Sequence, residues 1–103
     1  MNLSEIQKLV YEECEKNGYV KMWNEHGKVG DIAELGLIPT EVAEAQEEIR
    51  NKNTDFTHLG IECADIIIRT LNFMSRKNLN AEAFIRAKNN SNINREHLHG
   101  KDV

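Results

Sequence analysis

The sequence is poor in the residues that mark several classes of protein. Its 103 residues include one proline, two cysteines and 6% aromatic residues. Two thiols, at Cys14 and Cys63, are too few for a disulfide framework, which favours free thiols in a reducing compartment. No apolar run approaches the roughly 20 residues of a membrane span, and the N-terminus lacks the basic and apolar regions of a secretory signal. We therefore expect a cytoplasmic protein that does not enter a membrane.

Positive charge is also scarce. Thirteen basic residues stand against 17 acidic ones, which gives a net charge of −4. A protein that binds nucleic-acid polymers or anionic membranes normally displays a basic face, so neither partner is expected. Hydrophobic residues make up 40% of the chain and charged residues 29%, an ordinary globular mixture.

The length predicts a single domain over residues 1–103. A chain of 11.8 kDa buries only about 60–68% of its unfolded surface, and its aromatic content is low. We therefore expect association into a homo-oligomer, a dimer or a tetramer.

Hydrophobic periodicity predicts helices throughout. The first helix carries Leu3, Ile6, Val10 and Cys14 at helical spacing, with Ser4 and Gln7 as a possible capping box and Gly18 as its end. Residues 19–30 are expected to form a loop or a short broken helix.

Three further helices are expected after this segment. The second begins with Asp31 as its cap, has Ile32, Leu35, Ile38, Val42, Ala45 and Ile49 on one stripe, and should kink or restart near Pro39. The third is capped by Thr54 or Asp55, and its centre, residues 60–74, is apolar nearly all round, which is typical of a buried helix. The fourth is capped by Asn80, with Ala83, Phe84 and Ala87 facing inward, and a polar tail follows from about residue 89. Four helices with short connections predict an all-α, antiparallel four-helix bundle.

Two pairs of acidic residues stand out on the second and third helices. Glu41 and Glu44 are three residues apart, as are Glu62 and Asp65, so each pair shares one helical face. Glu62 and Asp65 lie within an apolar segment, where an unpaired carboxylate is costly. Antiparallel packing of the two helices would bring the four carboxylates together. A divalent cation would neutralise them, and oxygen-only ligands favour Mg²⁺, with Mn²⁺ as a substitute.

The same residues resemble a known family. Glu41-Val-Ala-Glu44 within residues 40–50 and Glu62-Cys-Ala-Asp65 within residues 60–69 are similar to the paired blocks of the MazG-like all-α nucleoside triphosphate pyrophosphohydrolases. Lys88, Asn92, Arg95 and the closing His99-Gly100-Lys101 resemble a C-terminal signature of its small members. The resemblance covers roughly residues 30–103.

The resemblance implies hydrolysis of a nucleoside triphosphate to a monophosphate and pyrophosphate. It assigns Glu41, Glu44, Glu62 and Asp65 to magnesium binding and catalysis. Substrate contacts would come from Lys88, Asn92, Arg95 and Arg69, which neutralise or hydrogen-bond the triphosphate, and from Trp23, which stacks on the base or anchors the core.

Two alternatives remain open. The chain could be a non-catalytic helical bundle that binds nucleotides or a partner and has lost turnover through Pro39, Thr40 or its altered tail. A carboxylate-bridged iron protein is the more distant alternative. Asp55, His58 and Glu62 hint at iron ligands, but the Glu-x-x-His pair of a di-iron bundle is absent.

Overall fold

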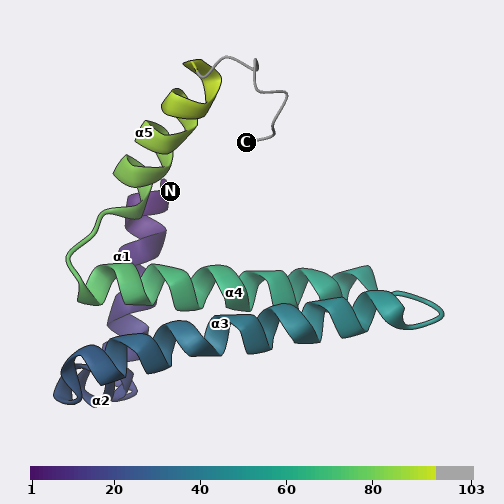
Figure 1. The fold of residues 1–103 in the computed structure, drawn as a ribbon, viewed down its shortest axis with the longest axis horizontal. Coiled ribbons are helices and arrows are strands. Elements are labelled where there is room, and N and C mark those ends of the chain that lie inside the picture. The colour runs from purple at the N-terminus through teal and green to yellow at the C-terminus, as the bar shows by residue number, and fades with distance from the viewer. Residues whose placement is uncertain (95–103) are drawn as a thin grey trace.

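The chain folds into helices alone over residues 1–94, the part that the computed structural model describes (Figure 1). The described residues form five helices: α1 (Leu3–Lys16), α2 (Tyr19–Glu25), α3 (Gly27–Arg50), α4 (Phe56–Arg76) and α5 (Ala81–Asn94). The all-α prediction is confirmed. The expectation of four helices is wrong, because residues 19–30, expected to be a loop or a short broken helix, form the short helix α2 and the start of α3.

A tight corner joins α2 to α3. Gly30 lies in the first turns of α3 against the backbone carbonyl of Trp23, where a β-carbon would collide. The backbone N–H of Gly30 donates to the carbonyl of His26, so the new helix begins within one residue of the previous one. Asp31 therefore lies inside α3, and its predicted role as the cap is wrong. This corner positions α2 across the base of α3.

Helices α3 and α4 form a long antiparallel hairpin that extends to one side of the molecule (Figure 1). Asp55, one of the two predicted caps, caps α4 by accepting hydrogen bonds from the N–H groups of Thr57 and His58. Helix α3 continues through Pro39 without the predicted restart. Since Pro39 is exposed, water can solvate the carbonyl of Leu35, which loses its helical donor.

Helix α1 crosses the end of the hairpin and connects it to α5. The buried amide of Gln7 donates to the hydroxyl of Ser75 and to the carbonyl of Leu79, and accepts from the N–H of Ala81. The cap of α1 is formed by Asn2 and Glu5, not by the predicted Ser4–Gln7 pair. Ser4 instead donates its N–H and hydroxyl to Glu82.

Helix α5 leaves the hairpin and packs on α1 (Figure 1). Asn80 caps it as predicted, accepting from the N–H of Ala83. The predicted inward face is wrong, because Ala83, Phe84 and Ala87 are all exposed. The helix also runs to Asn94, so residues 89–94 are helical and not part of a tail. A closed four-helix bundle is therefore not what one chain forms.

A buried ionic network holds α2, α3 and α4 together at the base of the hairpin. The guanidinium of Arg76, 1% exposed, donates to Glu34 at 2.8 Å, to Asp31 at 2.9 Å and to Asn24 at 2.7 Å. Asn72 adds a 2.8 Å hydrogen bond from its amide to Glu34. Hydrogen bonds from Lys77 and then from Arg76 lower the pKa of Asp31 from its ordinary value of 3.8.

No helix among the described residues is long and apolar enough to cross a membrane.

Candidate metal centre and adjoining pocket

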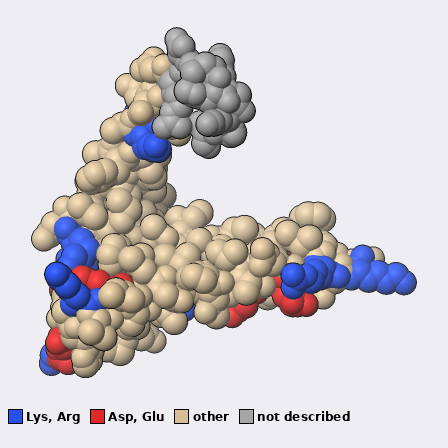
Figure 2. Space-filling view, in the orientation of Figure 1, with Lys and Arg blue, Asp and Glu red and all other residues tan. Residues whose placement is uncertain are grey.

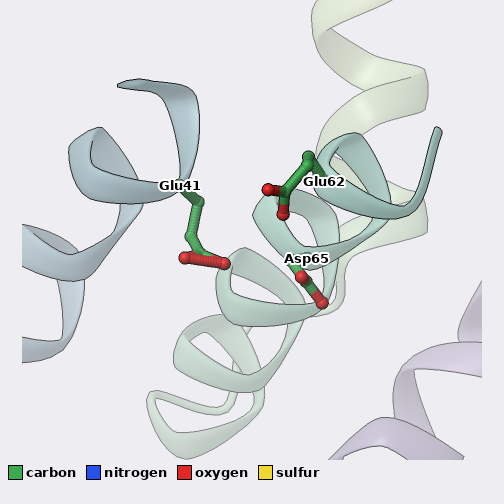
Figure 3. A group of neighbouring side chains, drawn as sticks. All are labelled: Glu41, Glu62 and Asp65. Atoms are coloured by element: carbon green, nitrogen blue, oxygen red, sulfur yellow. The ribbon is translucent and has the colours of Figure 1, made fainter. Parts of the chain in front are cut away.

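Three carboxylates meet between α3 and α4 (Figure 3). Glu41 comes from α3, and Glu62 and Asp65 come from successive turns of α4, since residues three apart share a helical face. One oxygen of each lies within 4.8 Å of the others. Glu41 and Glu62 are buried, and Asp65 is half-buried. Three of the four predicted acidic ligands are therefore brought together.

Glu44, the fourth predicted ligand, is exposed and lies outside this group. Its charge nevertheless acts on the cluster. Burial is the main cause that raises the pKa of Glu62 above its usual 4.5, and the negative charge of Glu44 raises it further. The charges of Glu41 and Asp65 act in the same direction, while His58, with its Nε2 atom 3.5 Å from Glu62, acts against them.

The three carboxylates fit a small divalent cation. Oxygen ligands in an octahedral magnesium site lie about 3–4 Å apart, given Mg–O distances of about 2.1 Å. Side-chain adjustments of less than about 1 Å would bring the cluster to that spacing. The donor set contains only carboxylate oxygens, which suits Mg²⁺ or Mn²⁺ better than softer metals.

A pocket of about 490 Å³ adjoins the carboxylates. Glu41 and Asp65 contribute to its wall, so the carboxylate cluster opens directly into it. Arg69, predicted as a substrate contact, also lines the pocket, with its Nε atom 3.8 Å from Glu41. Trp23 and Tyr19, both from α2, line it as well. The remaining lining residues are Cys14, Met22, Glu34, Leu37, Ile68 and Asn72.

Asn72 is one of the pocket residues that sequence reasoning missed, together with Tyr19 and Glu34. It is 3% exposed, and its amide nitrogen is held by Glu34. Its side-chain oxygen has no hydrogen-bond donor, which is unusual for a buried acceptor and costs about 1–3 kcal/mol. The signal was present in the spacing, because Asn72 follows Asp65 by seven residues, two helical turns along the same face.

The predicted C-terminal contacts lie elsewhere. Lys88 and Asn92 are exposed on α5, where they line a shallow depression with Phe84, Ile85 and Asn89. Neither lines the pocket beside the carboxylates. Arg95 and the segment from His97 to Lys101 lie outside the described residues.

The chain was compared with protein-family models, curated proteins and solved structures. No protein-family model matches the chain, and no curated protein or solved structure matches it.

Proposed function

We propose that the protein is a magnesium-dependent nucleoside triphosphate pyrophosphohydrolase, related to the MazG-like enzymes and acting on cytoplasmic nucleotide pools. The observation that carries the proposal is the shared wall of the two sites. Glu41 and Asp65 belong to the carboxylate cluster and also line a pocket whose wall includes the aromatic residues Trp23 and Tyr19. This arrangement suits a ligand with a phosphate chain at the metal and a planar base in the pocket.

Different residues of the chain bind the cation, accept a proton and contact the triphosphate in this proposal. Glu41, Glu62 and Asp65 hold the cation, which when bound supplies phosphate neutralisation and a water of lowered pKa. In this proposal Glu44, which is exposed and acts electrostatically on Glu62, accepts a proton or binds a second ion. Arg69 leaves its 3.8 Å pairing with Glu41 to contact the triphosphate.

In this proposal the base lies against the aromatic residues of the pocket wall. Trp23 and Tyr19 supply flat apolar surfaces for stacking. Asn72 lines the pocket, and its side-chain oxygen accepts no hydrogen bond within the protein. This oxygen favours a ligand whose N–H group can donate to it. The enzyme acts as a homo-oligomer, because the single chain leaves many apolar side chains in water.

The deciding experiment measures pyrophosphate release from a panel of ribo- and deoxynucleoside triphosphates, with Mg²⁺ and with excess chelator. We expect release that the chelator abolishes, with the nucleoside monophosphate as the second product. Release of orthophosphate would contradict the proposed bond cleavage. Magnesium binding by folded protein without turnover of any triphosphate would favour the non-catalytic bundle.

Magnesium should stabilise the protein more strongly at pH 7.5 than at pH 5. The pKa of Glu62 in the folded, metal-free protein is raised above its usual 4.5. Its protonated form therefore favours folding at low pH, and this contribution to the free energy of unfolding is lost as the pH rises through the raised pKa. Cation binding needs the ionised carboxylates and removes their repulsion, so its effect grows as they lose protons. Magnesium at 100 times its Kd adds about 2.7 kcal/mol.

Thermal melts with and without Mg²⁺ at the two pH values measure this difference. The Glu62→Gln variant is the control and should show a much smaller magnesium-dependent shift. Equal shifts at both pH values in the wild type would mean that the cation binds elsewhere.

A further inference from the structure

The pocket beside the carboxylates is lined at two levels of the α3–α4 hairpin. Glu41 and Asp65 form the first level, which we call the metal level. Glu34 lies seven residues before Glu41 on α3, and Asn72 lies seven residues after Asp65 on α4. Seven residues are two helical turns, so Glu34 and Asn72 keep the same helical faces about 10 Å nearer to the end of the hairpin that contacts α2. We call these two residues the inner level.

A hydrogen bond joins the two residues of the inner level. The Nδ2 atom of Asn72 donates to Oε2 of Glu34 over 2.8 Å, so α3 and α4 also meet at this level. Both residues line the pocket, and each is only 3% exposed. The separation of the two levels is similar to the length of a nucleotide from its first phosphate to the far edge of its base. A nucleotide with its phosphates at the metal level would therefore place the edge of its base at the inner level.

The inner level presents hydrogen-bond acceptors. Oε1 of Glu34 accepts from Nε of Arg76 at 2.8 Å, and Nη2 of Arg76 lies 2.7 Å from the same oxygen. Each carboxylate oxygen has two acceptor positions, so Oε2, with its one bond from Asn72, keeps a second position. A carboxylate has no donor, so the Asn72 atom that faces it must be the nitrogen. The oxygen of Asn72 is buried and has no donor within the protein.

The network of Arg76 fixes this orientation. Arg76 also donates to Asp31 and Asn24, and Lys77 donates to Asp31 at 2.8 Å. Figure 2 shows basic and acidic side chains together at this end of the hairpin, on the left of the view. The carboxylate of Glu34 cannot turn away from Arg76 without breaking a buried ion pair, which is costly. Glu34 is therefore held in place as an acceptor before any ligand binds.

Two neighbouring acceptors discriminate among nucleobases. Cytosine and adenine carry an exocyclic amino group, whose two N–H bonds can be donated to Asn72 and to Glu34. Uracil, thymine and hypoxanthine carry a carbonyl oxygen at the corresponding position. That oxygen is repelled by the carboxylate, and it leaves the oxygen of Asn72 without a donor. A site built to hydrogen-bond an amino group therefore rejects the analogue that lacks it.

We propose that Glu34 and Asn72 contact the nucleobase of the substrate and select nucleotides whose base carries an exocyclic amino group. The inference rests on the proposed function, because it takes the triphosphate to be bound at the carboxylate cluster. Glu34 and Asn72 determine which nucleotide binds, whereas the affinity for the cation depends on Glu41, Glu62 and Asp65.

The first test compares matched nucleotides on the wild-type protein. The probes are α,β-methylene triphosphates with Mg²⁺, because these analogues cannot be cleaved between the α and β phosphates. Trp23 is the one tryptophan of the sequence and lines the pocket, so its fluorescence reports binding. We expect the CTP analogue to bind about 10- to 100-fold more tightly than the UTP analogue, the effect of a hydrogen bond to a charged group. The ATP analogue should exceed the ITP analogue in the same way.

The second test reverses the preference with Glu34→Gln. The oxygen of the new amide can accept from Arg76, and its nitrogen then donates to the oxygen of Asn72. The amide of Asn72 turns over and presents Nδ2 to the nucleobase, which favours a carbonyl oxygen. We expect the ratio of affinities to shift toward the UTP analogue by about 10-fold or more, while Mn²⁺ affinity is retained. Glu47→Gln, on the same helix but 68% exposed, is the control and should keep the wild-type ratio.

Each failure has a distinct meaning. Equal binding of the CTP and UTP analogues by the wild type would overturn the selection by Glu34 and Asn72, and pyrophosphate release in the same preparation would leave the proposed function intact. A folded Glu34→Gln protein with the wild-type ratio would assign the contact to other residues. If that variant does not fold, the wild-type comparison of the ATP and ITP analogues decides. Absence of binding of every analogue in the presence of Mg²⁺ would overturn both proposals.

Discussion

Replacing Arg76 with alanine should lower the free energy of unfolding by about 3–5 kcal/mol, a large share of the 5–15 kcal/mol of a typical domain. The guanidinium is 1% exposed and hydrogen-bonds Glu34, Asp31 and Asn24. Its loss leaves the carboxylates of Glu34 and Asp31 close together without their shared cation. Urea denaturation followed by circular dichroism, at one fixed protein concentration, measures the change.

Arg86→Ala is the matched control for this prediction. Arg86 pairs with Glu82 at 3.1 Å on α5, but its side chain is 78% exposed. Exposed pairs of this kind contribute about 0–1 kcal/mol. Arg76→Lys should lie between the two, because lysine keeps the charge but lacks the planar fork that reaches three acceptors. If Arg76→Ala and Arg86→Ala had equal effects, the network would not be what joins α2, α3 and α4.

The second large effect is expected from Glu62→Gln. The substitution keeps the shape of the side chain and removes the charge at the centre of the carboxylate cluster. We expect the affinity for Mg²⁺ or Mn²⁺, and any pyrophosphate release, to fall about 100-fold or more, because one ligand interaction is worth several kcal/mol. Calorimetric titration with Mn²⁺ measures the binding, and the pyrophosphate assay measures turnover.

Glu47→Gln separates this effect from a general loss of negative charge. Glu47 lies on α3 six residues after Glu41, but its side chain is 68% exposed and pairs with Arg50. The Glu47→Gln variant should bind metal and turn over like the wild type. Unchanged metal affinity in Glu62→Gln would refute the metal site, whereas lost affinity in a protein without hydrolase activity would refute only the proposed reaction.

The acidic cluster was the part of the site that the sequence predicted best. Glu41, Glu62 and Asp65 could be placed together because their spacing is local and because an acid within an apolar segment needs a neutralising partner. Asp55 and Asn80 were likewise predictable as caps, since capping depends on residues within one turn. Features that depend on contacts within a few residues are read well from a single sequence.

Features that depend on distant contacts were missed. The ion pair of Arg76 with Glu34 joins residues 42 positions apart, and no local pattern specifies it. The corner at Gly30 depends on the backbone of the preceding helix, so the sequence could not decide between a loop and a short broken helix for residues 19–30. Leu35, Val42 and Ile49, which share the apolar stripe of the second predicted helix, are exposed, because periodicity shows that residues share a face and not whether that face is buried.

The hydrogen bonds of Gln7 and Ser4 have a consequence for synthesis of the chain. The partners of α1 are Ser75, Leu79, Ala81 and Glu82, between 68 and 78 residues downstream. At a translation rate of about 5–20 residues per second, these partner residues are synthesised roughly 4–15 s after the residues of α1 that they contact. The hairpin of α3 and α4 can pair during that interval, because its helices are adjacent in sequence. Helix α1 leaves the ribosome before the other four described helices, but it is among the last of them to make its tertiary contacts.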